Sequence, residues 1–125
     1  MNILLDTHEL LWWLVDSPSL SAKARMLISD PENTVFVSAV SLWEVRLKES
    51  LGKLRVPEDF DQRLAAQALE HLPLTAAQTH HVRSLPWHHR DPFDRMLVAQ
   101  ALAENLILLT ADARVSAYGD FVRLV

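Results

Sequence analysis

The segment Asn2–Leu14, NILLDTHELLWWL, carries the pattern that decides the fold. Its first residues, Asn2–Leu5, form a short apolar run that predicts a buried strand, and Asp6 follows this run directly. Apolar residues then recur at helical spacing as far as Val15, where the breaker at residues 16–18 (Asp-Ser-Pro) is expected to end the helix. The segment therefore predicts a strand, a carboxylate and a helix in immediate succession.

The same alternation of strand and helix continues along the chain. Further helices are predicted over residues 21–29, 41–51, 75–84 and 92–104, with one opened by Pro57 and a short turn near Ala113. Further strands are predicted over residues 34–37, 106–109 and 121–124, and residues 71–74 are either a strand or a connector. This order predicts an α/β fold in which helices cover both faces of a parallel sheet.

Length and composition limit the possible classes of protein. The chain has 125 residues without a repeat or linker, which predicts one domain over residues 1–125. It contains no Cys, which excludes a disulfide framework and a thiolate zinc site. Its two glycines, Gly52 and Gly119, stand too far apart for a glycine-rich phosphate loop.

The charge and hydropathy patterns also bear on partners and location. The formal net charge is -4, which by itself argues against nucleic acid, because phosphate binding favours a basic surface. The longest stretch without Asp, Glu, Lys or Arg is residues 71–82, well short of the roughly 20 residues that a membrane-spanning helix needs. With no basic leader before Asp6, we expect a cytoplasmic protein that does not associate with membranes.

Four acidic residues are expected at one edge of the predicted sheet. Asp6 and Asp112 each follow a predicted strand directly, and Glu44 and Asp94 are predicted in the first turns of helices. Right-handed crossovers bring the carboxyl ends of the strands and the amino ends of the helices to the same edge. Ligands of such folds bind outside that edge, so the four carboxylates form a candidate site.

Helix capping offers a structural explanation for each acid taken alone. The pairs Asp6–Glu9 and Ser41–Glu44 have capping-box spacing, and Asp91, Asp94 and Asp112 suit helix starts. Capping does not explain why four acids should gather without basic partners. Two carboxylates 4 Å apart repel by about 4 kcal/mol at an effective dielectric constant of 20, so such a cluster needs a counter-ion or a protonated member.

The counter-ion that best suits this chemistry is a hard divalent cation. An all-oxygen site without Cys favours Mg²⁺ or Mn²⁺, which accept phosphate oxygens and activate water. The cluster is therefore a candidate nuclease centre, in which bound cations also offset the negative charge that argued against nucleic acid.

Four blocks of the sequence resemble the PIN domain, and in particular the VapC-type toxins of bacterial type II toxin–antitoxin systems. The blocks are LLDTHELLWWL (4–14), VSAVSLWEV (37–45), HRDPFDRMLVAQA (89–101) and ILLTAD (107–112). The resemblance implies a three-layer α/β/α sandwich with a short parallel sheet, and a Mg²⁺- or Mn²⁺-dependent endoribonuclease. It also implies a homodimer and a cognate VapB- or Phd-like antitoxin.

The resemblance also assigns roles to individual residues. It implies that the catalytic and metal-binding acids are Asp6, Glu44, Asp94 and Asp112, and that the supporting polar residues are Thr7, Ser41 and Thr110. Asp91 lies three residues before Asp94, so both side chains could face the cleft. We assign the metal role to Asp94 and helix capping to Asp91, which is also a candidate supporting residue of the site. Candidate RNA contacts, each with an alternative role in packing or ion pairing, are His8, Arg46, Lys48, Arg90 and Arg95.

Other conspicuous residues have ordinary explanations. The pairs His80–His81 and His88–His89 lack the spacing of a zinc protease, and we expect them to be solvated. Trp12 and Trp43 are expected to pack in a core or a dimer interface. The preferred function is hydrolysis of RNA by metal-activated water.

Two alternatives to RNA hydrolysis stay open. One is a PIN-fold module that binds RNA or protein without cleavage. The other is a receiver-like phospho-acceptor domain, which is disfavoured because Asp6 is followed by Thr7 and no lysine occurs after Lys53.

Overall fold

The sheet at the centre of the molecule is five-stranded and entirely parallel, in the order β3-β2-β1-β4-β5. The computed structural model describes all residues from Met1 to Val125. The strands are β1 (Asn2–Leu5), β2 (Thr34–Ser38), β3 (Glu70–Leu72), β4 (Ile107–Thr110) and β5 (Val122–Leu124). The helices are α1 (Thr7–Leu14), α2 (Ala22–Ser29), α3 (Ala39–Ser50), α4 (Phe60–Ala65), α5 (Ala76–Thr79), α6 (Pro92–Glu104) and α7 (Ala113–Ser116), with the 3₁₀ helix η1 (Val82–Ser84).

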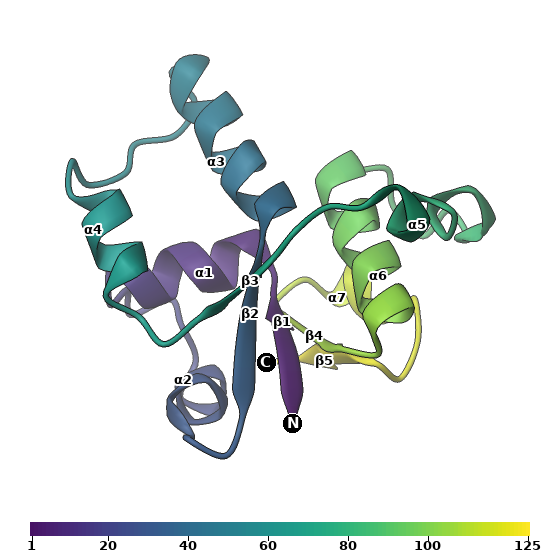
Figure 1. Cartoon of the computed structure of the whole chain (residues 1–125), viewed down its shortest axis with the longest axis horizontal. Helices are drawn as coiled ribbons and strands as arrows, with labels where there is room; N and C mark the ends of the chain where they lie inside the picture. Colours follow the sequence, from purple (N-terminus) through teal and green to yellow (C-terminus); the bar gives the residue numbers. More distant parts are fainter.

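Helices cover both faces of the sheet, which confirms the predicted α/β sandwich. Figure 1 shows α1, α2 and α4 on one side of the strands and α5, α6 and α7 on the other. Because successive side chains of a strand point to opposite faces, Ile3 and Leu5 pack in one apolar cluster and Leu4 packs in the other. The sheet thus separates two cores, which is the three-layer arrangement.

Three helical boundaries differ from the prediction. The helix predicted from Ser41 begins at Ala39, because the hydroxyl of Ser38 caps it by accepting a hydrogen bond from the Val40 amide at 3.0 Å. The helix after Pro57 begins only at Phe60. Residues 75–84 form α5 and η1 rather than one helix, and the guanidinium of Arg95 binds the carbonyl groups at residues 82 and 85.

The remaining elements agree with the pattern in the sequence. The ambiguous segment near residue 71 is a strand, since β3 pairs with β2 through Val37 and His71. Asn105 ends α6 in the left-handed conformation with φ of 54°. None of the helices has both the length and the apolar character required to cross a membrane.

Candidate active site

The four predicted acids all lie on the side of the sheet where the strands end. Asp6 follows β1 and caps α1, and Asp112 follows β4 and caps α7. Asp94 lies in the first turn of α6. The prediction for Glu44 is wrong in one detail: α3 starts two residues earlier than predicted, so Glu44 occupies its second turn and Ser38, not Ser41, is the cap.

The electrostatics show that these carboxylates are close to one another. Burial, and after it the negative charges of Asp6, Asp91, Glu44 and Asp112, raise the pKa of Asp94 from 3.8 to about 8. Asp94 therefore lies within electrostatic reach of the other three acids. The structure therefore brings together the acids that the sequence places on four different segments.

Asp6 is buried and held by two hydrogen bonds. Its Oδ2 accepts from the Thr110 hydroxyl at 2.6 Å, and its Oδ1 accepts from the His8 amide at 2.8 Å. Burial nevertheless raises the pKa of Asp6, because loss of solvent outweighs these two bonds. The Thr110 oxygen also accepts from the amide of Asp112 at 3.1 Å, so one hydroxyl joins two of the acids.

Glu44 is buried with one oxygen paired and the other orphaned. Its Oε2 accepts from Lys48 Nζ at 2.5 Å, whereas its Oε1 is buried without any hydrogen-bond partner. Close by, the buried hydroxyl of Thr7 donates to that of Ser41 at 3.0 Å and links α1 to α3. A buried carboxylate oxygen without a partner is costly, and a cation would satisfy it.

Asp112 has a basic partner as well. Its Oδ2 accepts from Arg114 Nη2 at 2.8 Å, and this hydrogen bond from Arg114 holds the pKa of Asp112 below its ordinary value. Together with the Lys48–Glu44 pair, this corrects the expectation that the acids gather without basic partners. Two of the four acids are paired with cations of the chain itself.

Asp94 is contacted by a histidine that the sequence did not single out. His89 was expected to be solvated, but only 3% of its side chain is exposed, and its Nε2 lies 3.2 Å from Asp94 Oδ2. Asp91 caps α6, since its Oδ1 accepts from the Asp94 amide at 3.0 Å. The capping alternative for Asp91 is thus confirmed, and its membership of the site stays a prediction.

The side chains match a divalent cation in chemistry and charge, although they do not form a finished coordination shell. No three of the Asp, Glu and His side chains lie close enough together to hold a metal ion as they stand. Two of the carboxylates are bound by cations of the chain, Glu44 by Lys48 and Asp112 by Arg114. The orphaned Oε1 of Glu44 and the repulsion felt by Asp94 are what a hard cation would relieve.

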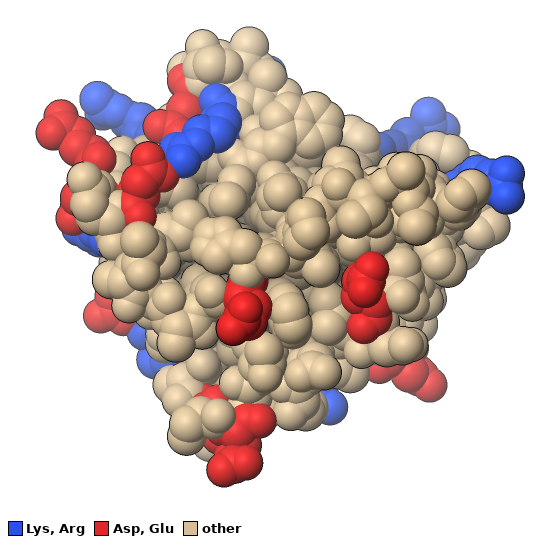
Figure 2. Space-filling model, in the orientation of Figure 1, with Lys and Arg blue, Asp and Glu red and all other residues tan.

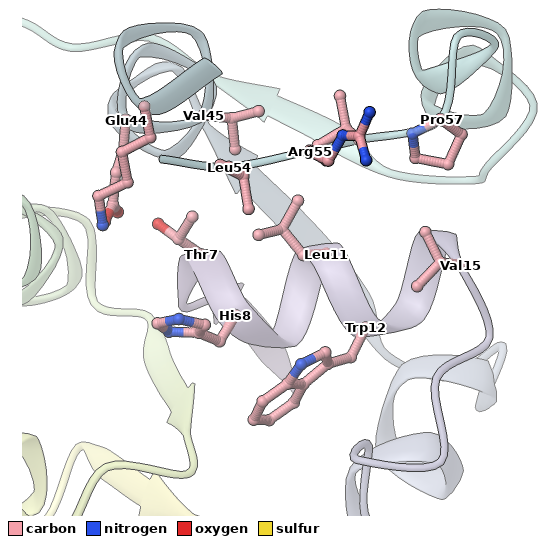
Figure 3. A pocket seen from close by; sticks show the side chains of 12 residues that line it. Thr7, His8, Leu11, Trp12, Val15, Glu44, Val45, Leu54, Arg55 and Pro57 are labelled. Atoms are coloured by element: carbon pink, nitrogen blue, oxygen red, sulfur yellow. The ribbon is translucent and has the colours of Figure 1, made fainter. Parts of the chain in front are cut away.

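Two hollows open beside these acids. Asp6 and Asp112 line one of about 360 Å³, and Glu44 lines another of about 250 Å³ between α1, α3 and the segment 54–57. Figure 3 shows the second, with Leu11 directed toward Leu54 and with His8 and Trp12 on the lower side of α1. His8 and Trp12 line both hollows, so the two adjoin at these side chains.

The five candidate RNA contacts differ in their surroundings. The side chain of His8 is 65% exposed and Arg90 is exposed without an ion pair, whereas Lys48 binds Glu44. Arg46 is paired with Asp61 at 2.5 Å, in a region over α3 and α4 where Figure 2 shows acidic and basic side chains interspersed. No broad basic surface appears on that face.

The prediction for Arg95 is wrong because this side chain is buried. The residue is 3% exposed, and its guanidinium donates to the carbonyls of Pro86 and Leu85 and to the Tyr118 hydroxyl. It also stacks on the Trp87 ring, with Cζ 3.7 Å from the ring centroid. Arg95 therefore secures the segment before α6 and is not available to a phosphate.

Several supporting residues were missed from the sequence. A buried chain of hydrogen bonds joins Ser38 to Gln100 at 2.5 Å and Gln100 to Gln78 at 3.0 Å, tying the start of α3 to α6. The only indication of these contacts in the sequence was a glutamine among the apolar residues of VAQA.

Trp43, expected in a core or an interface, is 57% exposed, and its ring meets that of Phe93 edge-on with the centroids 4.9 Å apart.

The fold and the site together define a small α/β domain with acidic residues at the carboxyl edge of a parallel sheet. The sequence model of the PIN domain matches residues 3–120, and the chain belongs to the PIN domain family. No curated protein matches the chain at a significant level.

Three solved structures share the fold. A chain of VapBC2 from Rickettsia felis, bound to a DNA fragment from its promoter, has a TM-score of 0.72 and 19% identity, covering 100% of this chain and 98% of that one. FitAcB from Neisseria gonorrhoeae has a TM-score of 0.67 and 22% identity, and the match covers 98% of this chain and 96% of that one. A toxin–antitoxin complex from Klebsiella pneumoniae has a TM-score of 0.63 and 18% identity, and the match covers 97% of this chain and 95% of that one.

Proposed function

We propose that this chain is a Mg²⁺- or Mn²⁺-dependent endoribonuclease and the toxin of a type II toxin–antitoxin module. The observation that carries the proposal is the convergence of four carboxylates on Asp94, whose pKa is raised by burial and by their charges. Membership of the PIN domain family supports it. We infer that residues 1–125 act as a single domain.

In this proposal the acids hold the cation and the surrounding groups hold the acids. Asp6, Glu44, Asp94 and Asp112 supply oxygen ligands, and Thr7, Ser41 and Thr110 keep the ends of β1, β4 and α3 in place. A bound divalent cation supplies Lewis acidity, which activates water and neutralises charge on a phosphodiester. Asp94 must be ionised to bind a cation, so cation binding releases the proton that its raised pKa retains.

Basic side chains near the acids are proposed to contact the RNA backbone. His8 is exposed beside Asp6, with Nδ1 3.9 Å from Oδ1, and Arg90 is exposed just before Asp91. Lys48 binds Glu44 and lines the same hollow as His8. These positions place basic groups beside the acids, which a chain of net charge -4 provides only locally.

We further propose an antitoxin of the VapB or Phd type as a protein partner, a homodimeric assembly and a cytoplasmic location. The names of the structural neighbours support the antitoxin, since they include toxin–antitoxin complexes. The apolar hollow along α1 supports it further, because Leu11, Val45 and Leu54 line it beside Glu44. A partner segment seated there would cover Glu44.

The test is cleavage of a single-stranded RNA in the presence of Mn²⁺. The unmodified chain is expected to cut it, Asp94→Asn to lose cleavage, and Asp120→Asn to retain it, because Asp120 is exposed and makes no hydrogen bond. Asp91→Asn tests whether Asp91 belongs to the site. Full activity of Asp94→Asn would overturn the proposal, and tight RNA binding without cleavage would favour the binding-module alternative.

A further inference from the structure

A buried histidine connects Asp94 to a tyrosine on a distant part of the chain. His89 Nδ1 lies 3.0 Å from the Tyr118 hydroxyl, and His89 Nε2 lies 3.2 Å from Asp94 Oδ2. His88, the preceding residue, is exposed. The ring of His89 is therefore turned inward, and both of its nitrogens have partners.

The donors and acceptors define one direction for this chain of hydrogen bonds. Arg95 has only donors, and its Nη1 donates to the Tyr118 oxygen at 2.9 Å. The Tyr118 hydroxyl can then donate to Nδ1 of His89, which at 3.0 Å is nearer than the other acceptor, the His89 carbonyl oxygen at 3.5 Å. This leaves the proton of the neutral ring on Nε2, facing Asp94.

Arg95, Tyr118 and His89 form a relay of hydrogen bonds that ends at Asp94, and other contacts fix its members. Arg95 donates to the carbonyl oxygens of Leu85 and Pro86, at 3.3 and 2.8 Å, and stacks on Trp87. Tyr118 follows α7, the short helix that Asp112 caps. The relay therefore joins the segment before α6 to the segment after α7 and passes through the ring of His89.

We propose that His89 is a positioning residue, which holds Oδ2 of Asp94 through the Arg95–Tyr118–His89 relay so that Oδ1 is presented to a divalent cation. Oδ1 makes no hydrogen bond within the protein. This inference rests on the proposed function, because it takes Asp94 as a cation ligand. Groups that orient a ligand in this way commonly contribute 10–100-fold to metal affinity, as an order-of-magnitude estimate.

The experiment measures Mn²⁺ binding directly, from the electron paramagnetic resonance signal of free Mn²⁺. His89→Leu is expected to weaken Mn²⁺ binding by about 10–100-fold. His89→Gln is expected to restore most of the affinity, since its side-chain amide can donate to the same oxygen. His88→Gln is the matched control: His88 packs its ring edge-on against Tyr118 at 4.9 Å and has no contact with Asp94, so affinity should not change.

A second readout follows the ring itself. In the unmodified protein, ¹⁵N spectra of the His89 ring should show the proton on Nε2. Tyr118→Phe removes the hydroxyl donor, so it should alter this signature and weaken Mn²⁺ binding while the thermal unfolding transition remains cooperative. If His89→Leu fails to fold, Tyr118→Phe tests the positioning role of His89 in its place.

The outcomes separate this inference from the proposed function. Unchanged Mn²⁺ affinity in a folded His89→Leu or Tyr118→Phe protein overturns the positioning role, as does failure of His89→Gln to improve on His89→Leu. If the unmodified chain binds Mn²⁺ through Asp94 but cleaves no RNA, the proposed function fails and the positioning role stands.

Discussion

The four acids divide into two pairs that the protein treats differently. Asp6 and Asp94 are held by uncharged groups, the Thr110 hydroxyl and the buried ring of His89. Glu44 and Asp112 are paired with cations, Lys48 and Arg114, whose side chains are 36% and 69% exposed. The first pair is therefore fixed in orientation, and the partners of the second pair can move into solvent.

This difference has a physical consequence for cation binding. A hydroxyl or a neutral imidazole orients a carboxylate and leaves its full negative charge available to a cation. A lysine or an arginine neutralises the carboxylate, so a cation must compete with it. Solvent and salt screen the Arg114–Asp112 pair, which is exposed. The Lys48–Glu44 pair is screened less, because Lys48 is partly exposed but Glu44 is buried. We infer that Asp6 and Asp94 form the permanent part of the site, with Glu44 and Asp112 joining on binding.

The largest expected effect comes from removing a fixed acid. Asp6→Asn should lower Mn²⁺-dependent RNA cleavage by more than about 100-fold, because a ligand contributes more than the groups that orient it. Asp112→Asn should cost less, since Asp112 already shares its charge with Arg114. Cleavage rates of the two variants, measured side by side, test the distinction between fixed and cation-paired acids. A larger loss of activity in Asp112→Asn than in Asp6→Asn would contradict this distinction.

The next effect tests the neutral donor at Asp6. Thr110→Val keeps the shape of the side chain but removes its 2.6 Å hydrogen bond to Asp6, so Mn²⁺ affinity should fall by about 10–100-fold. Thr34→Val, at the exposed start of β2, is the control and should leave affinity unchanged. Equal affinities for the two variants would show that Asp6 needs no such support.

The stability of the metal-free protein should depend on pH through Asp94. Burial and the nearby carboxylates raise its pKa from 3.8 to about 8, so the folded state binds this proton more tightly than the unfolded chain does. Folding stability therefore falls as pH rises toward 8, because the unfolded state releases the proton first. Burial also raises the pKa of Glu9 to about 7, which acts in the same direction.

This dependence can be measured by urea unfolding in EDTA between about pH 7.5 and 8.5, where an unfolded histidine, with an ordinary pKa of 6.5, is already largely neutral. Asp94→Asn should flatten the profile, leaving the smaller slope of Glu9. Adding Mn²⁺ to the unmodified protein should raise stability most at pH 8, where the carboxyl is easiest to ionise. A profile that Asp94→Asn leaves unchanged would assign the effect to other groups.

The smallest expected effect comes from releasing a cation-paired acid. Arg114→Gln removes the cation that competes for Asp112, so Mn²⁺ affinity should rise by a few-fold at low salt. The rise should shrink at high salt, where the ion pair in the unmodified protein is already screened. A loss of affinity would instead show that Arg114 supports the site.

Much of the site follows from local rules. An acid directly after a buried strand must lie at the sheet edge, so Asp6 and Asp112 could be placed from the runs before them. Asp91 before Pro92 identifies a helix start, which locates Asp94 one turn inside. These predictions succeed because strand ends and helix caps depend on neighbours in the chain.

The partners of the acids could not be placed in this way. Nothing near His89 in the sequence indicates that its ring turns inward, because the cause is Tyr118, far along the chain. Arg95 was misjudged for the same reason, since the carbonyls of Leu85 and Pro86 become available to it only because η1 ends at Ser84.

The sequence by itself determined the alternation of strands and helices, the family and the four acids, because each depends on short-range patterns. Only the tertiary structure decided which acids are fixed and which are paired with cations. That choice depends on groups that approach from other elements, such as Thr110 beside Asp6 and Tyr118 beside His89. Burial and distance, which set both the hydrogen bonds and the pKa of Asp94, exist only once the layers have packed.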